Sequence, residues 1–218
     1  MRIAIVGGTG KEGRGLAIRW GRAGHVVIIG SRDANKALAR AAELIAAGHG
    51  AFEGADNFEA ARKGELTVLT VPYAAHAETL RTIEPAVSGK VVVDVTVPLV
   101  PPKVNRVQLP PGLAAAVEAQ QILGSKAQVV AALHHVSHAR LADPGAVVRC
   151  DVLVATNDEQ ARETVINLVK DLGLRGLDAG PLENAIALES LTPVLIQLNK
   201  RYKSSGAGVI FTNLPGAE

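Results

Sequence analysis

Short apolar runs alternate along the chain with longer segments in which apolar residues recur every three or four positions. Apolar runs rich in Val and Ile are typical of strands buried in a parallel sheet, and the longer segments are typical of amphipathic helices. The predicted strands cover residues 2–6, 25–30, 51–53, 66–71, 90–95, 128–133, 148–155 and 174–177. The predicted helices cover residues 11–23, 34–47, 58–63, 74–83, 113–123, 158–172 and 183–203.

This alternation predicts an α/β fold, a doubly wound parallel sheet with right-handed crossovers. Cap residues support several helix boundaries: Gly24 suits the end of the first helix, and Asp33 and Asn157 suit the start of two others. Pro193 is expected to kink the last helix. We find neither an internal repeat nor a low-complexity linker, so the sequence indicates no sharp domain boundary.

One segment, residues 98–111, interrupts the alternation with five prolines in fourteen residues. Proline lacks a backbone N–H, so this segment (the proline loop) is predicted to be neither helix nor regular strand. A loop of this length inside a compact chain is more often functional than accidental.

A glycine motif follows the first predicted strand and opens the first predicted helix. Its residues match G-x-G-x-x-G: Gly8, Thr9, Gly10, Lys11, Glu12 and Gly13. In this context the pattern is typical of dinucleotide binding, because glycines let the backbone approach a pyrophosphate that sits on the helix N-terminal amides. The alternative is a plain turn between strand and helix.

The end of the second predicted strand favours NADP over NAD. An NAD site carries Asp or Glu there, about twenty residues after the glycines, to bind the ribose 2′-hydroxyl. This chain has Ser31 and Arg32 instead, with Lys36 one helical turn further on. A hydroxyl and two cations suit a 2′-phosphate. The alternative is a solvated helix start, in which Asp33 pairs with Arg32.

Two similar segments follow later strands. Val71 and Pro72 come directly after one strand, and Val97 and Pro98 come after the next. In open parallel sheets the ligand crevice lies outside the carboxyl ends of the strands, so we expect these residues to line the nicotinamide ribose and ring. Without the glycine motif, each proline would be interpreted as a strand stop.

Composition and charge exclude several classes. The 218 residues contain 3% aromatic side chains and carry a net charge of +2, which argues against a stacking platform or a basic surface for nucleic acid. No stretch approaches the roughly 18 apolar residues of a membrane helix, and the apolar N-terminal run is too short for a signal peptide. We therefore expect a soluble, cytoplasmic protein that binds small molecules and contacts neither nucleic acid nor a membrane.

Three of the six histidines lie within five residues: His134, His135 and His138. Metal ligation, a polar pocket wall and solvated surface are the alternatives, and we assign no metal because neither Cys nor a cluster of acids lies nearby. The single cysteine, Cys150, lies in an apolar run and is expected to be inert core. Trp20 is expected to lie in the core or an interface.

Several blocks together resemble the coenzyme F420-dependent NADP oxidoreductase family, in order and over nearly the whole chain. They are Gly7–Gly10, Gly30–Arg32, Leu69–Pro72, Leu133–His134, Asp178–Leu182, Glu189–Pro193 and Gly208–Phe211. The resemblance implies a Rossmann domain over residues 1–135. A small C-terminal α/β extension over residues 136–218, ending in a long helix, would complete the deazaflavin pocket and a dimer contact.

The resemblance also implies the reaction and its residues. Hydride passes reversibly between NADPH and F420, an 8-hydroxy-5-deazaflavin, in a protein that is commonly a homodimer. Catalysis is by positioning, with the two rings about 3–3.5 Å apart, and needs no nucleophile. The NADP contacts carry over to Thr9, Gly10, Lys11, Glu12, Ser31, Arg32 and Lys36. His134, a candidate catalytic residue, Ala139 and Ala207 carry over as contacts near the deazaflavin.

Two departures from the family pattern bear on the acceptor: Tyr73 replaces a larger indole, and residues 101–106 differ from the usual loop. A reductase with another acceptor (an imine, a flavin or a metal chelate) and a non-catalytic NADP-binding sensor remain alternatives. The F420 tail carries a phosphodiester and carboxylates, so its path should be lined by cations. The candidates are Lys103, Arg106, Lys200, Arg201 and Lys203, although each alone suits ordinary solvated surface.

Overall fold

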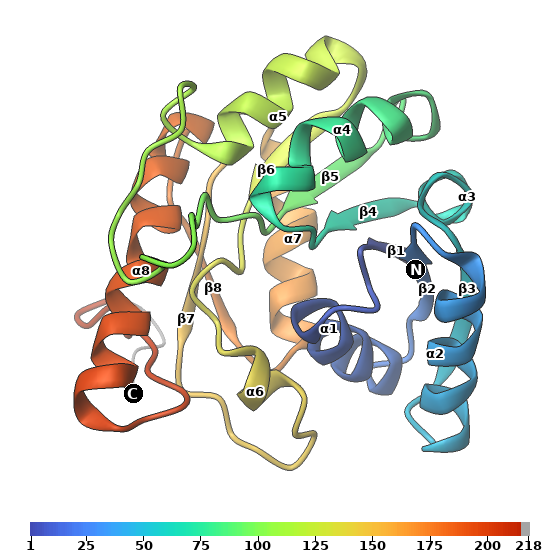
Figure 1. Ribbon diagram of the computed structural model, residues 1–218, viewed down its shortest axis with the longest axis horizontal. Coiled ribbons are helices and arrows are strands. Elements are labelled where there is room, and N and C mark those ends of the chain that lie inside the picture. Colours follow the sequence, from blue (N-terminus) through green and yellow to red (C-terminus); the bar gives the residue numbers. More distant parts are fainter. Residues whose placement is uncertain (215–218) are drawn as a thin grey trace.

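A six-stranded parallel sheet forms the centre of the computed structural model, which describes residues 1–214 (Figure 1). The strand order is β3-β2-β1-β4-β5-β6, so the chain reverses its direction of growth between β1 and β4. The strands of this sheet are β1 (Arg2–Val6), β2 (Val26–Ser31), β3 (Ala51–Asp56), β4 (Leu66–Leu69), β5 (Val91–Asp94) and β6 (Gln128–Ala131). The predicted doubly wound α/β fold of Rossmann type is confirmed.

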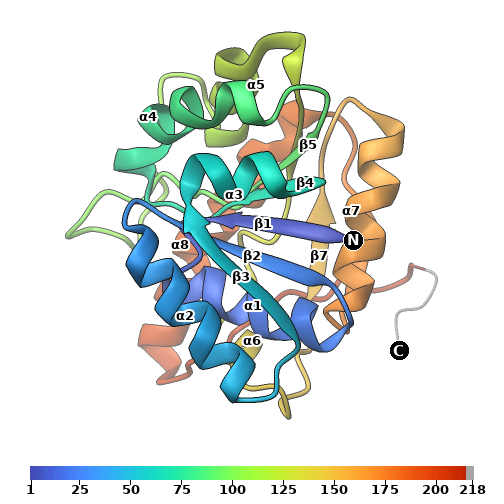
Figure 2. The ribbon, with the colours of Figure 1, turned by 90° about the vertical axis from the view of Figure 1, so that its right-hand side faces the viewer.

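Helices cover both faces of the sheet (Figure 2). The larger core cluster joins one face to α1, α2 and α7, and the second cluster joins the other face to α4, α5 and the end of α3. Successive side chains of a strand point to opposite faces of the sheet, so a strand that is apolar throughout needs helices on both faces. In β1, Ile3 and Ile5 pack in the first cluster, whereas Val6 packs in the second. The helices are α1 (Lys11–Arg22), α2 (Ala34–Ala46), α3 (Asn57–Lys63), α4 (Tyr73–Ile83), α5 (Ala115–Leu123), α6 (His138–Leu141), α7 (Glu159–Asp171) and α8 (Ala185–Tyr202).

The C-terminal part adds a small parallel sheet of β7 (Asp151–Val154) and β8 (Arg175–Asp178), followed by the long helix α8. It continues the main core without interruption, because Val152 and Val165 belong to the same cluster as Leu16 and Trp20. The Trp20 indole Nε1 donates a hydrogen bond of 2.9 Å to the carbonyl of Leu168, so Trp20 lies in the core as expected. Cys150 is buried as well.

Several predicted boundaries differ from the observed ones: the strands predicted at 66–71, 128–133 and 148–155 are shorter, and the helix His138–Leu141 was not predicted. Three other differences have a clear local reason. The strand predicted at 51–53 continues to Asp56, because six residues pair in register with β2. The helix predicted from residue 113 begins at Ala115, because Leu113 has φ 70° and lies outside the helical region. Asn157 does not cap α7: the Asp158 carboxylate accepts the hydrogen bond from Ala161 N, and the Asn157 side chain accepts one from Leu182 N.

Short 3₁₀ turns extend three of the helical segments: η1 (Glu84–Ala86), η2 (Gly124–Lys126) and η3 (Leu182–Asn184). The last of these leads directly into α8, in which Pro193 is a buried, internal residue. Within residues 1–214, no helix is both long and apolar enough to span a membrane.

Candidate functional site

The predicted site residues gather at one edge of the main sheet, where the carboxyl ends of its parallel strands meet. The glycine loop leaves β1, Ser31 ends β2, and the segments with Val71 and Val97 leave β4 and β5. The segment that carries His134 leaves β6. The order of the strands thus brings together residues that lie more than 120 positions apart in the sequence.

The glycines between β1 and α1 differ in how closely other atoms approach them. A Cβ on Gly13 would lie 2.6 Å from Gly8 Cα, so this glycine permits α1 to pack against the loop. Gly7 has φ +80°, and a Cβ there would lie 2.9 Å from Val71 Cγ1. By contrast, a Cβ on Gly10 would have the Gly7 carbonyl oxygen, at 3.3 Å, as its sole close neighbour among the described residues. The protein itself therefore leaves space beside Gly10.

Helix α1 begins at this open position without a side-chain cap, since Gly10 is its N-cap residue. The first helical hydrogen bond runs from Arg14 N to the Gly10 carbonyl, so the amides of the preceding turn are left for another acceptor. An anion such as a pyrophosphate fits this end of a helix. The Glu12 side chain lies in the same turn, and burial raises its pKa to about 8.

The segment after β2 presents one hydroxyl and two cations. Ser31 is buried, and its Oγ accepts a hydrogen bond from Asp33 N. Arg32 and Lys36 are both exposed. The Asp33 carboxylate caps α2 and lies 3.8 Å from Lys36 Nζ, so its ion pair is with Lys36 rather than Arg32. Among the described residues nothing pairs with the Arg32 guanidinium, which is therefore available to a ligand.

At the ends of β4 and β5 the backbone is braced by buried polar groups. The Thr70 hydroxyl donates to the Val6 carbonyl at 3.0 Å, which ties the end of β4 to β1. Asp94, the last residue of β5, pairs with His76 of α4, with 2.6 Å between Oδ2 and Nε2. Its other oxygen accepts a hydrogen bond from Thr96 N. These contacts hold the chain just before the expected nicotinamide-side residue Val97.

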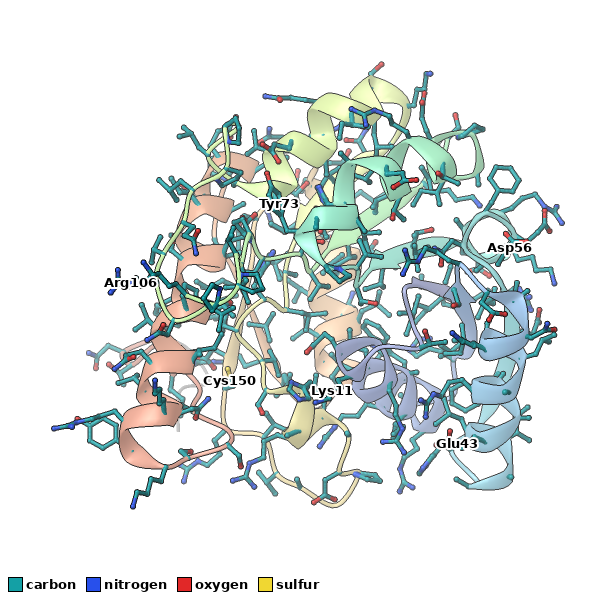
Figure 3. All side chains as sticks on the ribbon, viewed as in Figure 1. Lys11, Glu43, Asp56, Tyr73, Arg106 and Cys150 are labelled. Atoms are coloured by element: carbon teal, nitrogen blue, oxygen red, sulfur yellow. The ribbon has the colours of Figure 1, made fainter. Side chains whose placement is uncertain are left out.

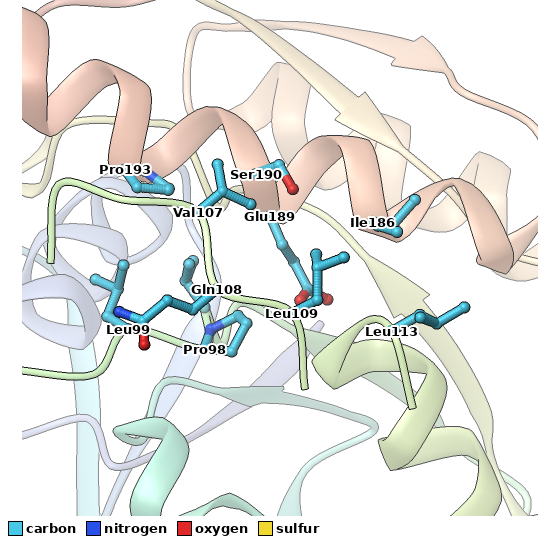
Figure 4. A pocket seen from close by; sticks show the side chains of 11 residues that line it. Pro98, Leu99, Val107, Gln108, Leu109, Leu113, Ile186, Glu189, Ser190 and Pro193 are labelled. Carbon is cyan, nitrogen blue, oxygen red and sulfur yellow. The ribbon is translucent and has the colours of Figure 1, made fainter. Parts of the chain in front are cut away.

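A narrow, mostly apolar pocket continues from this segment toward α8 (Figure 4). Val97 and Pro98 form one side of it, and the proline loop and α8 form the others. Glu189 of α8 reaches into it, and its carboxylate accepts hydrogen bonds from the backbone amides of Ala115 and Ala116, at 2.8 and 3.0 Å. The first turn of α5 is thus capped by a residue of another helix, and burial raises the pKa of Glu189 to about 8.

His134 lies in the loop after β6 and is 95% buried, with neither ring nitrogen hydrogen-bonded within the described structure. Burial lowers its pKa to about 4, so the ring is neutral at pH 7. The Thr192 hydroxyl donates to its backbone carbonyl at 2.8 Å, which ties the loop to α8. His135 instead contacts the carbonyl of Asp151, and His138 is exposed at the start of α6. The three rings thus have separate surroundings, and residues 1–214 contain no group of three His, Cys, Asp or Glu side chains placed to hold a metal.

The remaining predicted residues lie in helices, loops and the tail outside the strands. Pro72 is exposed and caps α4, Ala139 is exposed on α6, and Ala207 lies in the tail after α8. Lys11, at the start of α1, faces the region between α1 and α6 (Figure 3). Arg106 lies on the outer side of the proline loop in the same view.

Sequence reasoning missed three polar contacts that hold the site together: His76 with Asp94, Glu189 with α5, and Asp151 with Arg175. Their partners are 18 to 74 residues apart, so spacing carries no signal for them. Glu189 does lie within the Glu-Ser-Leu-Thr-Pro block that the sequence singled out, but the block does not reveal its partner.

Comparison with known proteins gives a consistent result. The family described as "NADP oxidoreductase coenzyme F420-dependent" matches residues 2–98. The F420-dependent NADP reductase of Methanocaldococcus jannaschii is 40% identical, with 98% of this chain and 99% of that protein aligned. That of Methanothermobacter marburgensis is also 40% identical, over 99% and 100% of the two chains.

The crystal structure of a protein from Arthrobacter sp. FB24 superposes with a TM-score of 0.82 at 29% identity. It covers 98% of this chain and 100% of that one. The likeness therefore extends through the C-terminal part as well as the main sheet. With 40% identity over its full length, this chain belongs to the F420-dependent NADP reductase family.

Proposed function

We propose that this protein is an enzyme that transfers hydride between NADPH and coenzyme F420. The observation that carries the proposal is the full-length match to reductases of this name, in a fold that gathers the predicted dinucleotide residues at one sheet edge. NADPH, F420 and a proton give NADP⁺ and reduced F420, and the reaction is reversible. The protein contributes binding, orientation and exclusion of water.

The NADP half of the site is proposed to extend from α1 to α2. The open position at Gly10 and the uncapped amides of α1 would hold the pyrophosphate. Ser31, Arg32 and Lys36 would hold the 2′-phosphate, since a guanidinium can bind phosphate through two parallel hydrogen bonds. Asp33 leaves Arg32 free for this contact, because it caps α2 and pairs with Lys36.

The hydride-transfer half is proposed to lie where β4, β5 and β6 end. Val71, Pro72, Val97 and Pro98 would line the nicotinamide, and His134 would form a neutral wall beside the deazaflavin. A neutral ring suits this place, because a cation without a partner is costly to bury. The C-terminal segment 136–218, which carries Ala139 and Ala207, would complete the acceptor pocket.

The test is visible absorbance spectroscopy. Adding NADPH to enzyme and oxidised F420 should bleach the deazaflavin absorbance, and adding NADP⁺ to reduced F420 should restore it. A catalytic amount of enzyme must suffice in both directions. If stopped-flow mixing with saturating NADPH and F420 shows no hydride transfer at any salt concentration, the assignment of F420 as the acceptor is wrong. That result would not contradict the proposed NADP site.

We also propose that the enzyme is a homodimer in the cytoplasm, where both co-substrates diffuse freely. Apolar side chains on the outer face of α8 support a contact between copies: Val194 and Leu198 are exposed, and Tyr202 is 74% exposed. Light scattering after size-exclusion chromatography should give twice the mass of the 22.6 kDa chain. Leu198→Glu should shift the protein to the monomer.

A further inference from the structure

The proline loop forms one wall of the apolar pocket beside Val97, and its residues Val107 and Leu109 line that pocket (Figure 4). These two side chains nevertheless remain 47% and 53% exposed. Burial of apolar surface therefore does little to hold the loop in place. The position of this wall depends on the polar contacts that fasten the loop.

The start of the loop is fastened through the buried pair of Asp94 and His76. Asp94 Oδ1 accepts a hydrogen bond of 2.9 Å from Thr96 N, and Asp94 Oδ2 lies 2.6 Å from His76 Nε2. The His76 ring in turn stacks on the ring of Tyr73, with 6.0 Å between the ring centroids and 27° between the planes. The ring of Tyr73 thus rests on the pair that fixes the start of the loop.

The end of the loop is fastened by the partner of the Tyr73 hydroxyl. This hydroxyl donates to Glu118 Oε2 at 2.8 Å, and Glu118 Oε1 accepts a hydrogen bond of 3.0 Å from Gly112 N, directly after the loop. The packing is close, since a Cβ on Gly112 would lie 2.4 Å from Glu118 Cγ. Burial and the contact with Glu118 raise the pKa of Tyr73 to about 12, so its hydroxyl keeps its proton and donates at neutral pH.

Tyr73 therefore joins the anchors at the two ends of the loop: its ring contacts His76, and its hydroxyl binds Glu118. The helix that carries Glu118, α5, is itself held by the carboxylate of Glu189 from α8. We propose that Tyr73 and Glu118 are positioning residues for hydride transfer, which hold the proline loop so that the pocket wall keeps the two reacting rings in place. The inference rests on the proposed function. Both residues act through the loop rather than by touching a co-substrate.

Limited proteolysis measures how firmly the loop is anchored, without any co-substrate. Trypsin cleaves after Lys103 and Arg106, which both lie within the loop, and mass spectrometry identifies these two cuts. Tyr73→Phe removes the hydroxyl alone. The two cuts should then become about tenfold faster, because loss of one hydrogen bond to a charged group increases the population of the released loop.

A double-mutant cycle tests whether the two residues act through one contact. Glu118→Ala removes the partner of the hydroxyl and of Gly112 N, so it should accelerate the same cuts at least as much as Tyr73→Phe. The double variant Tyr73→Phe/Glu118→Ala should be cleaved no faster than Glu118→Ala.

Stopped-flow mixing in a single turnover tests the effect on the reaction. With saturating NADPH and F420, the rate of hydride transfer should fall about tenfold in Tyr73→Phe, because a small misplacement of the two rings slows the transfer. The Kd for NADPH should stay unchanged, since the proposed NADP contacts lie on α1 and α2. A merely structural role would lower Tm without this separation of rate from affinity.

Two variants of α4 are matched controls. Thr82→Val removes an exposed hydroxyl that donates to the Glu78 carbonyl, and Glu78→Ala removes an exposed carboxylate. Both should be cleaved in the loop, and should transfer hydride, at the rates of the unaltered enzyme. Thermal unfolding of each variant shows whether the fold is retained.

Three results would overturn the positioning role: loop cleavage that is unchanged in Tyr73→Phe, faster cleavage without slower hydride transfer, or effects of the two substitutions that simply add. Slower turnover that arises only from weaker NADPH binding would overturn it as well. Failure of the proposed function would look different. The unaltered enzyme would then transfer no hydride to F420, and the positioning role would fall with it, although proteolysis would still show whether the Tyr73 hydroxyl fastens the loop.

Discussion

Asp94 and His76 form a fully buried ion pair, with 2.6 Å between carboxylate Oδ2 and imidazole Nε2, where β5 ends beneath the proposed nicotinamide site. Burial disfavours the charged form of both groups, but the attraction between the two charges is the stronger effect. The pKa of His76 is therefore raised by Asp94, and the pKa of Asp94 is held below its usual value by His76. Because Asp94 also accepts from Thr96 N, the pair fixes the strand end that precedes Val97.

Removing one partner of this pair should destabilise the fold strongly. Asp94→Asn would leave His76 buried without its anion, and the free energy of unfolding should fall by about 3–5 kcal/mol. Urea unfolding followed by circular dichroism measures this. Glu59→Gln, which breaks an exposed pair with Arg62, should leave the free energy of unfolding almost unchanged, because water screens the charges of an exposed pair.

The same pair predicts a pH dependence. The raised pKa of His76 contributes stability that is complete below its reference value of 6.5 and is lost as the pH rises through the folded pKa. The lowered pKa of Asp94 contributes stability that is complete above 3.8 and is lost as the pH falls through its folded pKa. The difference in unfolding free energy between wild type and Asp94→Asn should therefore be largest between these limits and shrink on both sides. A difference that is constant from pH 3 to pH 10 would contradict the ion pair.

Two glycines of the loop should respond oppositely to an added side chain. Gly10→Val should abolish binding of both NADPH and NADH with little change in Tm, because the space beside Gly10 is left open by the protein and is the proposed pyrophosphate position. Gly13→Ala should lower Tm instead, because its Cβ would lie 2.6 Å from Gly8 Cα. Fluorescence titration and calorimetry separate the two effects. Unfolding of Gly10→Val would show that this glycine is structural.

Arg32 should decide the choice of nucleotide. Arg32→Ala removes a charge-assisted hydrogen bond to the 2′-phosphate, worth about 1.5–3 kcal/mol, so the Kd for NADPH should rise about ten- to a hundredfold while the Kd for NADH barely changes. Lys36→Ala should act in the same direction, and Arg22→Ala should have no effect on either nucleotide. Equal losses for NADPH and NADH would show that Arg32 does not hold a 2′-phosphate.

His134 should affect the chemical step rather than NADPH binding. His134→Ala should lower kcat by loosening the placement of the acceptor ring, with the KM for NADPH unchanged. Burial lowers the pKa of His134 to about 4, so this ring does not titrate between pH 6 and 8. The pH dependence of kcat in that range should therefore be the same in the wild type and in His134→Ala. The KM for F420 should rise with salt to the same extent in both proteins. A titration near pH 6.5 that is lost in His134→Ala would contradict a neutral ring.

The main sheet could be predicted from the sequence because its information is local. A short apolar run such as residues 2–6 indicates a buried strand from its own residue types. The spacing of Gly8, Gly10 and Gly13 directly after this run indicates a turn and the start of a helix. The sequence also shows that Ser31 and Arg32 stand where an NAD site carries an acidic residue, because one βαβ unit sets the distance between that position and the glycines.

The contacts that hold the site were decided by the tertiary structure. Glu189 caps α5 from a position 74 residues away, and Asp151 binds both Arg175 and the tail. Burial, rather than residue type, makes His134 neutral. His135 is buried as well but contacts the Asp151 carbonyl, and His138 is exposed. The sequence alone determined the strands of the main sheet, the helices between them and the dinucleotide motif that opens the first helix, because all of these depend on neighbours along the chain. The packing of β5, β6 and α8 decides which polar groups are removed from water and which partners they contact. This packing exists only in the folded protein, so the sequence pattern does not reveal it.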